Sequence, residues 1–576
     1  MRTALHCLAL LISFFFVSSS FATPLNSTSQ AAVAMPDSYS AEVARKVLLS
    51  GGNAVDASVA AAFVLAVTYP EAGNLGGGGF MTLYTDEAAS SQKQAYFLDY
   101  REKAPKAAFR DMYLNAKKAV IPYKSLVGYQ ASGVPGTVMG LWAAHQRFGK
   151  LPWASLVQPA IVLAEKGFVV PKDLEKVARW YQKWIANKST VPLNFKRYFG
   201  ELKTGRLFKQ PELAATLKRI AQTGPYDFYF GQTAQFIVEE MQSQDGLITL
   251  DDLAHYEVKW RQPVQADWKG YQVVSAPPPS SGGVAIVQLL KMKAILENQY
   301  QDALLSMDKA GVPPQATRAH FYAELSKRVY ADRAQYLGDP DFIKVPTKKL
   351  ISNAYLRKRA ADVLMDEISE TQTIKPGLAE STDTTHFSVV DAQGNAVSNT
   401  YTLNMPFGSG VVVSKAGFLM NDEMDDFSTK PGVANVFGVV GGKANEIAPE
   451  KRMLSSMSPT ILVKNGAVEM VVGTPGGSSI ITSVFQTIVN VIDRHLSPQR
   501  AVDAPRVHHQ LLPKDVIMYH PDLSTETKQA LRLMGYQLKR NNYLGDVQLI
   551  VRQHGKLQAA SDVRGRGVSK VFSVKP

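Results

Sequence analysis

Two strand-like runs joined by a short turn leave this chain few ways to fold around residues 384–404. The runs are TTHFSVV and AVSNTYTLN, and the pentapeptide DAQGN between them is rich in turn-forming residues. If these five residues form the loop of an antiparallel hairpin, Val390 lies opposite Ala396. The two runs then form neighbouring strands of one sheet.

The same pairing brings polar side chains together at the other end of the hairpin. Counting outward from the loop, Thr384 lies opposite Thr402, and Asn404 shares their face because alternate residues of a strand point to the same side. A loop one residue shorter would instead oppose Thr384 to Tyr401. The first register predicts a cluster of two hydroxyls and one carboxamide.

The hairpin follows a segment of different composition. Residues 366–383, DEISETQTIKPGLAESTD, are polar, acidic and poor in aromatic residues, which is typical of a flexible linker. Threonines at the start of a strand have an ordinary explanation in packing. Alternatively, the chain is cut before Thr384, and the freed α-amino group, with an ordinary pKa of about 7.7–8.0, is the base that activates the hydroxyl.

The remaining chain alternates between helical and strand-like patterns. Residues 40–70 indicate two helices separated by Gly51-Gly52, and the glycine loop in EAGNLGGGGFMTLYTD runs into a strand. The region from about residue 134 to 364 is largely helical and includes a long candidate helix over residues 315–336. Strands that are apolar on both faces indicate an α+β fold in which helices cover the sheets.

A strand, a glycine turn and a helix are predicted at VEMVVGTPGGSSIITSVFQ. Ser478 or Ser479 is suited to cap the helix. The N–H groups of Gly476 and Gly477 would then point into the space above the strand, where they could stabilise an oxyanion. A Walker phosphate loop needs a lysine before the Ser/Thr, and none is present. A plain strand-to-helix turn stays open as an alternative.

Three short motifs contain charged or hydroxyl groups, some suited to bind a cation and others suited to bind an anion. NDEMDDF is the densest acidic cluster, and its Glu423 and Asp426, three residues apart, could face one way and bind an ammonium group. Arg101 in LDYREKAP and the pair Ser455 and Ser456 in KRMLSSMSP suit a carboxylate. Together these groups match the head group of an α-amino acid, although each alone is equally consistent with a surface charge or a turn.

The N-terminus has the pattern of a secretory signal peptide. Residues 1–22 contain Arg2, an apolar run from Ala4 to Val17 and small residues before Ala22. The one cysteine, Cys7, lies inside this segment, so the mature chain is expected to have no disulfide and no thiolate site. No later apolar run reaches the roughly 18 residues of a membrane span.

Composition and histidine placement exclude other classes. The net charge is +13, but the basic residues occur as scattered pairs, which favours a solvated basic surface over a nucleic-acid site. We find no His, Asp or Glu spacing typical of a metal site. His386 and the pair His508-His509 are interpreted as structural.

Taken together, these motifs resemble the γ-glutamyltranspeptidases. TTHFSVVDAQGNAVSNTYTLN is similar to that family's processing and nucleophile signature, and EAGNLGGGGFM, LDYREKAP, NDEMDDFS, RMLSSMSPT and GTPGGS occur in the family's order. The resemblance implies a four-layer αββα sandwich of the N-terminal-nucleophile hydrolases. It also implies a precursor that cuts itself between Asp383 and Thr384 into a large subunit, residues 23–383, and a small subunit, residues 384–576, which form a heterodimer.

The resemblance also implies a role for each candidate residue, with no cofactor and no metal. Thr384 would be the nucleophile on glutathione or another γ-glutamyl compound, and Thr402 its hydrogen-bonding partner. The implied oxyanion donors are Gly476 and Gly477; the implied ligands of the α-carboxylate are Arg101, Ser455 and Ser456; and those of the α-ammonium are Asn404, Glu423 and Asp426. Amino acids or dipeptides would be the acceptors, and a periplasmic or secreted location would follow from the signal peptide.

One departure from the family pattern lies in residues 428–447, which resemble the lid loop of bacterial members. Phe437 stands where those members commonly have a tyrosine, so it cannot donate a hydroxyl hydrogen bond. Two alternatives stay open. A cephalosporin acylase-type enzyme would act on glutaryl groups, which lack the ammonium that the acidic cluster suits, and a secreted amino-acid-binding protein would keep the pocket without catalysis.

Overall fold

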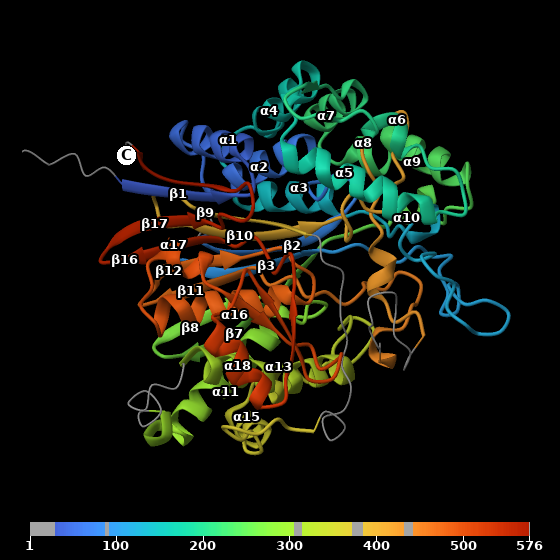
Figure 1. The fold of residues 1–576 in the computed structure, drawn as a ribbon. Coiled ribbons are helices and arrows are strands. Elements are labelled where there is room, and N and C mark those ends of the chain that lie inside the picture. The colour runs from blue at the N-terminus through green and yellow to red at the C-terminus, as the bar shows by residue number, and fades with distance from the viewer. Residues whose placement is uncertain (1–28, 87–91, 305–313, 371–383, 431–441, 575–576) are drawn as a thin grey trace, which may run out of the picture.

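Two large antiparallel sheets form the centre of the molecule (Figure 1). The computed structural model describes residues 29–86, 92–304, 314–370, 384–430 and 442–574. In spatial order, the seven-stranded sheet consists of β18 (Val568–Val574), β1 (Ser29–Met35), β9 (Thr385–Val390), β10 (Ala396–Thr402), β2 (Gly78–Thr85), β3 (Gln94–Tyr100) and β6 (Lys259–Arg261). The six-stranded sheet consists of β17 (Lys556–Ser561), β16 (Gln548–Gln553), β12 (Ala467–Gly473), β11 (Thr460–Lys464), β8 (Tyr271–Ser275) and β7 (Val264–Trp268).

The two sheets contact each other through one face and carry helices on the other (Figure 1). Strands β9 and β10 of the first sheet lie against β12 of the second. Small and branched side chains fill the contact, among them Ala32, Val390, Ile461, Val471 and Ile550. The strand pattern, apolar on both faces, is therefore explained by burial from two sides.

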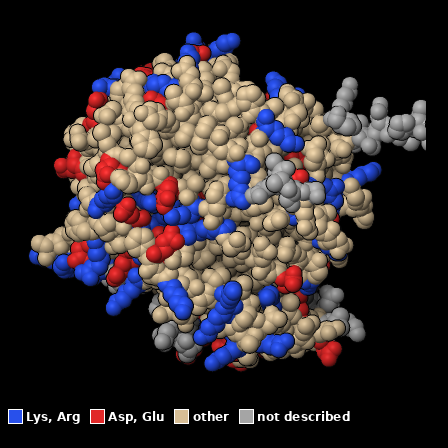
Figure 2. All heavy atoms as spheres, turned by 180° about the vertical axis from the view of Figure 1, so that it is seen from behind, with Lys and Arg blue, Asp and Glu red and all other residues tan. Residues whose placement is uncertain are grey.

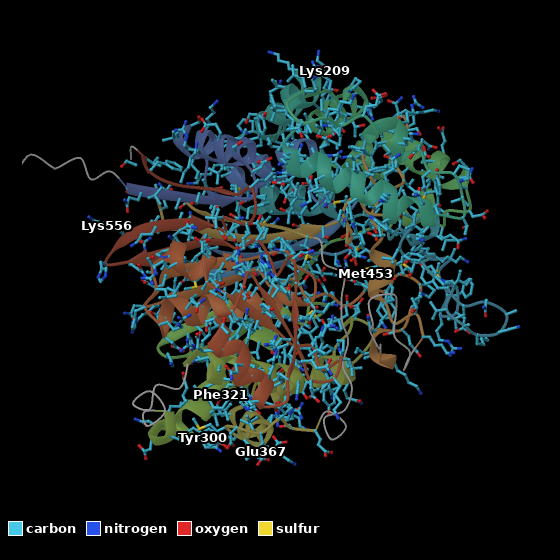
Figure 3. All side chains as sticks on the ribbon, in the orientation of Figure 1. Lys209, Tyr300, Phe321, Glu367, Met453 and Lys556 are labelled. Atoms are coloured by element: carbon cyan, nitrogen blue, oxygen red, sulfur yellow. The ribbon has the colours of Figure 1, made fainter. Side chains whose placement is uncertain are left out.

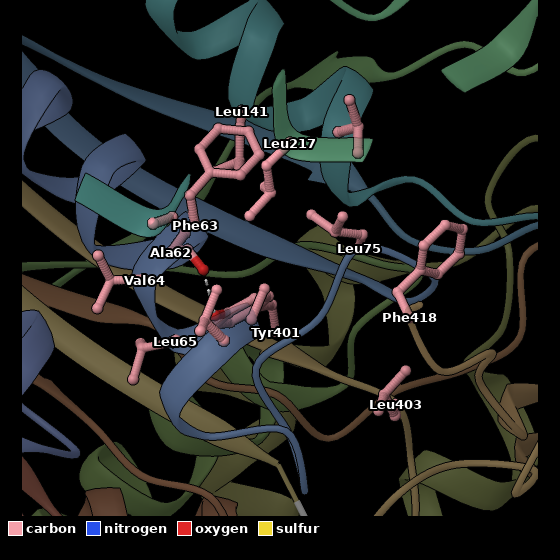
Figure 4. Close-up of a cluster of buried hydrophobic side chains, with 14 of the residues drawn as sticks. Ala62, Phe63, Val64, Leu65, Leu75, Leu141, Leu217, Tyr401, Leu403 and Phe418 are labelled. Atoms are coloured by element: carbon pink, nitrogen blue, oxygen red, sulfur yellow. Dashed lines mark hydrogen bonds between the residues drawn. The ribbon is translucent and has the colours of Figure 1, made fainter. Parts of the chain in front are cut away.

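Helix α2 (Ala54–Thr68) covers the outer face of β9 and β10, and α1 (Ser38–Leu49) packs beside it. Asn53 and Asp56 form a capping box at the start of α2, and every residue of the helix is buried. Tyr401 of β10 donates a hydrogen bond from its hydroxyl to Ala62 O at 3.1 Å, within the apolar cluster of Figure 4. The hairpin is thus fixed to α2 on this side.

Helices α11 (Gly282–Gln299), α13 (Pro314–Tyr336) and α16 (Ser479–Ile492) belong to the helical layer of the second sheet. Phe321 of α13 and Tyr300 after α11, both labelled in Figure 3, stack with ring centroids 5.9 Å apart. The helix predicted over residues 315–336 is confirmed. So are the two helices separated by Gly51-Gly52, where Gly51 has a φ of +89°.

The other elements surround these layers. Beside the first sheet and in the middle region lie η1 (Tyr129–Ala131), α3 (Thr137–Phe148), α4 (Trp153–Lys166), β4 (Phe168–Val169), α5 (Lys172–Trp184), η2 (Ala186–Lys188), α6 (Phe195–Phe199), β5 (Leu207–Phe208), α7 (Pro211–Thr223), α8 (Tyr226–Tyr229), α9 (Gln232–Gln242) and α10 (Leu250–Ala254). The remaining elements are α14 (Thr347–Leu350), α15 (Asn353–Ala360), η3 (Glu423–Asp426), η4 (Lys443–Asn445), α17 (Pro498–Asp503), β13 (Arg506–His508), β14 (Val516–His520), α18 (Thr525–Leu533) and β15 (Gln537–Arg540). On the face shown in Figure 2, basic and acidic side chains are interspersed.

Candidate active site

The hairpin has the register expected for a five-residue loop. Val390 pairs with Ala396, and Thr385 pairs with Tyr401. Thr384, one residue before β9, therefore stands opposite Thr402 at the end of β10. The exposed fraction is 8% for Thr384 and 2% for Thr402, so both hydroxyls lie in a sheltered position.

The turn after β10 connects the threonine pair to the acidic segment. Asn404 N–H donates to Thr402 Oγ1 at 2.7 Å, and its side-chain nitrogen donates to Asp422 O at 3.0 Å. Asn404 has a φ of +82°, a left-handed conformation that asparagine tolerates better than most residues. Among the described residues we find no hydrogen bond to Asn404 Oδ1, which leaves this oxygen available in the pocket.

Arg101 is fully buried and holds three groups at once. Its Nε–H donates to Met453 O at 3.3 Å, and its two terminal nitrogens donate to the carboxylates of Glu423 and Asp426. These carboxylates lie in η3, residues 423–426, here named the acidic turn. The groups predicted to bind the α-carboxylate and the α-ammonium of a substrate therefore pair with each other.

Burial and charge act in opposite directions on this cluster. Burial by itself lowers the pKa of Arg101, but Glu423 and Asp426 outweigh it and hold that pKa above its ordinary value. Burial raises the pKa of both carboxyl groups, and Arg101 counteracts part of the rise. Glu423 Oε2 is buried without a hydrogen-bond partner among the described residues. An ammonium group beside it would relieve that cost.

Glu102 is a further buried carboxyl that the sequence did not single out. It is 0% exposed, lies 3.7 Å from Arg101, and has a pKa raised to about 7 by burial. The sequence clue to its place in the site was that Glu102 directly follows Arg101. The charge pattern along the sequence did not indicate that its side chain is buried.

The predicted serine pair lies in a segment that we name the serine loop, residues 454–457. Ser455 N–H donates to Pro279 O at 2.9 Å, and Ser455 O accepts from the backbone and hydroxyl of Ser281 at 2.8 and 2.7 Å. Arg333 of α13 donates to the Ser281 hydroxyl at 2.9 Å. Ser456 Oγ is buried with no hydrogen-bond partner among the described residues. Its hydroxyl can therefore donate a hydrogen bond to a bound substrate.

The glycine turn between β12 and α16 has the conformation that glycine permits. Gly476 has a φ of +136° and Gly477 a φ of +55°. Their carbonyls accept from Ser479 N–H and Ile480 N–H, each at 3.1 Å, while no donation from either glycine N–H is found within the described ranges. In the described part of the chain both N–H groups thus lack a hydrogen-bond partner, as an oxyanion site requires.

The predicted serine cap of α16 is wrong. Ser478 occupies the N-cap position with helical angles, φ −56° and ψ −35°, and its side chain does not cap the helix. Its hydroxyl donates instead to Gln510 Oε1 at 2.7 Å, and Tyr330 of α13 donates to its carbonyl. Ser479 donates to Gly476 O at 2.7 Å. These hydrogen bonds fix Ser478 and Ser479, the two residues that follow the glycines of the turn.

One pocket gathers nearly all the candidate residues. It is lined by Arg101, Thr384, Thr402, Asn404, Glu423, Asp426, Ser455, Ser456, Met457, Gly477 and Ile480. Met457 and Ile480, which add an apolar wall, were not singled out from the sequence. Met457 directly follows the serine pair, and Ile480 directly follows GTPGGSS. Gly476, the residue before Gly477 in the chain, is not among the residues that line the pocket. Asp383 and Phe437, like the signal peptide, lie outside the described residues.

The histidines have structural surroundings. His386 is buried between the hydroxyls of Thr400, at 2.8 Å, and Ser388, at 3.1 Å, and burial lowers its pKa to about 3. The prediction that it is a satisfied structural residue is confirmed.

In the described part of the chain, no group of three or more His, Cys, Asp or Glu could hold a metal ion. No described helix has the length and apolarity to cross a membrane.

Comparison with known proteins decides what this pocket belongs to. A family model described as γ-glutamyltranspeptidase matches residues 40–572. The chain belongs to the γ-glutamyltranspeptidase family. A glutathione hydrolase proenzyme of Pseudomonas aeruginosa is 56% identical over 566 residues, which cover 97% of each chain. The glutathione hydrolase proenzyme of Escherichia coli K12 is 45% identical over 540 residues, covering 93% of this chain and 90% of that one.

Solved structures add the same family and its wider fold. A γ-glutamyltranspeptidase chain from Pseudomonas nitroreducens, in complex with L-DON, is 52% identical with a TM-score of 0.54, and covers 59% of this chain and 97% of its own. Cephalosporin acylase from Bacillus halodurans has a TM-score of 0.81 over 97% of this chain and 99% of its own, at 24% identity. The second likeness shows a shared mixed helix and sheet fold only.

Proposed function

We propose that this member of the γ-glutamyltranspeptidase family cleaves the γ-glutamyl amide of glutathione and related compounds. The γ-glutamyl group passes to water or to an amino-acid or dipeptide acceptor. One observation carries this proposal. A single pocket combines a threonine at the start of a strand, a glycine turn with free N–H groups, and charges of both signs for an amino-acid head group.

Thr384 is the proposed nucleophile, and cleavage between Asp383 and Thr384 is the step that activates it. The freed α-amino group takes the hydroxyl proton while Oγ attacks the γ-carbonyl carbon. The leaving amine takes that proton as the C–N bond breaks, and a γ-glutamyl-threonine ester remains. Water or an acceptor amine then attacks the ester carbonyl carbon and gives a proton to the α-amino group of Thr384. The C–Oγ bond breaks as this proton passes to Oγ, so the γ-glutamyl product leaves and Thr384 is regenerated. Thr402, opposite Thr384 in the hairpin register, hydrogen-bonds to the nucleophile.

The glycine turn stabilises the oxyanion of both steps. Gly476 and Gly477 offer N–H groups without internal partners in the described chain, at the N-terminus of a 14-residue helix. A preorganised donor of this kind contributes about 3–4 kcal/mol to a transition state. Tyr330 donates a hydrogen bond to Ser478 O, and the Ser478 hydroxyl donates one to Gln510. These bonds fix the residue next to Gly477 and so help to keep the two glycine N–H groups in place during the reaction.

The γ-glutamyl head group competes for the ion pairs that Arg101 makes with Glu423 and Asp426. Its α-carboxylate takes up part of the Arg101 guanidinium and the hydroxyls of Ser455 and Ser456. Its α-ammonium takes up Glu423, Asp426 and Asn404. Because each charge exchanges one ionic partner for another, binding avoids the full desolvation cost of burying new charges.

We extend the proposal to maturation. Residues 1–22 are a signal peptide that directs export to the periplasm or beyond, and residues 23–383 and 384–576 are the two subunits of a heterodimer. The solved Pseudomonas nitroreducens chain supports this division, since it is matched over 97% of its length by only 59% of this chain. The arrangement of helix layers outside two contacting sheets supports the four-layer αββα sandwich of N-terminal-nucleophile hydrolases.

Phe437 is proposed to loosen the lid. Its side chain has no hydroxyl group to donate a hydrogen bond, so the balance of hydrolysis and transfer is expected to differ from that of members with a tyrosine at this position. Phe437→Tyr is expected to shift the product ratio in a γ-glutamyl transfer assay with a dipeptide acceptor. An unchanged ratio would remove this part of the proposal.

The substrate class is tested by assaying a γ-glutamyl anilide beside its glutaryl counterpart, which lacks the α-ammonium. The proposal expects release of aniline from the first at a rate at least about 100-fold higher, because the acidic turn would face no cation in the second. Preference for the glutaryl compound would indicate the acylase alternative. Binding of L-glutamate without turnover of either compound would indicate a binding protein.

A further inference from the structure

The acidic turn and the serine loop are separate segments that must bind one small head group. The ammonium and the carboxylate of this head group are attached to the same carbon, so the two segments have to keep a fixed spacing. The serine loop is anchored to the rest of the protein through Ser281, which donates to Ser455 O at 2.7 and 2.8 Å. The question is what fixes the acidic turn to that anchored loop.

Asn445 joins the two segments directly. Its side-chain nitrogen donates to Asp426 O at 2.7 Å, and its side-chain oxygen accepts from Leu454 N–H at 3.0 Å. Asn445 is 2% exposed, and its carbonyl accepts from Ser428 N–H at 2.9 Å. One amide group therefore connects the last residue of the acidic turn with the residue before Ser455.

Arg101 makes the other connection, and substrate binding weakens it. Arg101 bonds Met453 O on the side of the serine loop and the carboxylates of Glu423 and Asp426 on the side of the acidic turn. A substrate carboxylate competes for the same guanidinium, and a substrate ammonium competes for the same carboxylates. The hydrogen bonds of Asn445 are neutral, involve main-chain groups of both segments, and lie outside this exchange of charges.

We infer that Asn445 is a positioning residue for the substrate head group, one that holds the acidic turn at the correct distance from the serine loop while Arg101 changes partners. This inference rests on the proposed function. It assigns to Asn445 the selection of substrates that carry both an α-ammonium and an α-carboxylate.

The chemistry of the site explains why asparagine is required. The two partners are a carbonyl oxygen and an N–H group, so the side chain must donate in one direction and accept in the other. Aspartate has the same shape but places a second acceptor against Asp426 O. Alanine leaves both main-chain groups without a partner in a buried position.

The test uses the purified, processed enzyme and the variants Asn445→Ala and Asn445→Asp. We expect the KM for the γ-glutamyl anilide to rise about tenfold in both, with kcat changed less than about threefold, because Asn445 touches no reacting atom. Asn187→Ala and Asn187→Asp are the matched controls. Asn187 is exposed, donates to Lys183 O at 3.0 Å, and lies on the surface helix region.

A second readout separates positioning from a general structural defect. Competitive inhibition by L-glutamate and by glutarate is measured on each enzyme, since the two inhibitors differ only in the ammonium group. We expect both variants to lose affinity for L-glutamate about tenfold while glutarate inhibition stays within about twofold. The Asn187 variants should match the wild type for both inhibitors.

The outcomes decide between the claims. Unchanged KM and inhibition ratios in processed variants would overturn the role of Asn445, as would an equal loss of affinity for both inhibitors. Failure of both variants to be processed and folded would overturn it too, because Asn445 would then be a folding residue. A wild-type enzyme that does not turn over the anilide would instead remove the proposed function itself, and this is measured first.

Discussion

The backbone N–H of Asn404 donates a hydrogen bond to the hydroxyl oxygen of Thr402 at 2.7 Å. In this bond the hydroxyl oxygen of Thr402 is the acceptor. Thr384 stands opposite in the hairpin register. We propose that the Thr402 hydroxyl donates a hydrogen bond to the nucleophile Thr384.

Thr402→Val tests this hydrogen bond. The substitution keeps the branched shape but removes the hydroxyl and leaves Asn404 N–H without its acceptor, so we expect kcat to fall about 100-fold. Thr402→Ser keeps the hydroxyl and should stay within about fivefold of the wild type. Steady-state kinetics on the γ-glutamyl anilide measures both. Thr223→Val, at an exposed helix end, is the control, and equal activity of the two Thr402 variants would refute the role.

Tyr330→Phe tests the support behind the glycine turn. The hydroxyl of Tyr330 donates to Ser478 O, and its ring packs edge-on against His508 with centroids 5.8 Å apart. Phenylalanine keeps the ring packing and removes only the donor. We expect kcat to fall about tenfold with little change in KM, because the oxyanion donors lose part of their preorganisation.

The exposed Tyr226 offers a matched control for that variant, since Tyr226→Phe should leave both kinetic constants unchanged. A rise in KM at constant kcat for Tyr330→Phe would contradict the account. It would mean that Tyr330 supports substrate binding rather than the transition state.

Arg101→Lys tests the geometry of the carboxylate site. Arg101 uses three nitrogens to reach Met453 O, Glu423 and Asp426, and a lysine ammonium is a single point of charge that cannot span them. We expect KM for the γ-glutamyl donor to rise at least about 100-fold, with a smaller effect on kcat. Retention of wild-type KM would show that charge alone is sufficient at this position.

Asp546→Asn tests the effect of a buried carboxyl on stability. Asp546 is 3% exposed and accepts from Gln548 at 3.0 Å, and burial raises its pKa from 3.8 to about 8, with Asp562 adding to the rise. The folded protein therefore holds a proton that the unfolded chain releases above about pH 4. The stabilisation from this proton is complete at low pH and is lost as pH rises towards 8.

We expect the wild type to lose more stability between pH 5 and pH 8 than Asp546→Asn, by at least about 1 kcal/mol in the free energy of unfolding. Urea unfolding at both pH values measures the difference. Asp267→Asn, at an exposed strand position, should follow the wild type. Identical pH slopes for Asp546→Asn and wild type would contradict the assignment.

The hairpin could be predicted from sequence because its determinants are local. The turn residues of DAQGN set the loop length, and the loop length sets which residues face each other, so the opposition of Thr384 and Thr402 followed from counting. The long helix α13 was predictable for a related reason, since its pattern persists over 23 residues.

The contacts inside the pocket could not be predicted in the same way. Arg101 meets Glu423 and Asp426 across 322 and 325 residues of chain, and only the packed fold shows that they pair. The serine cap failed because Ser478 has helical angles and bonds Gln510, a residue on a distant segment. Asn445 carried no motif of its own, since its role depends on two main-chain groups that folding brings to it.

We propose that Thr384 becomes a chain terminus and then the nucleophile. This is tested by a denaturing gel of the purified wild type beside Thr384→Ala, with N-terminal sequencing of every band. We expect two wild-type bands, the smaller beginning Thr-Thr-His-Phe, and one uncut, inactive chain for the variant. An active wild type that remains a single chain, or a Thr384→Ala protein that is cut and active, would contradict it.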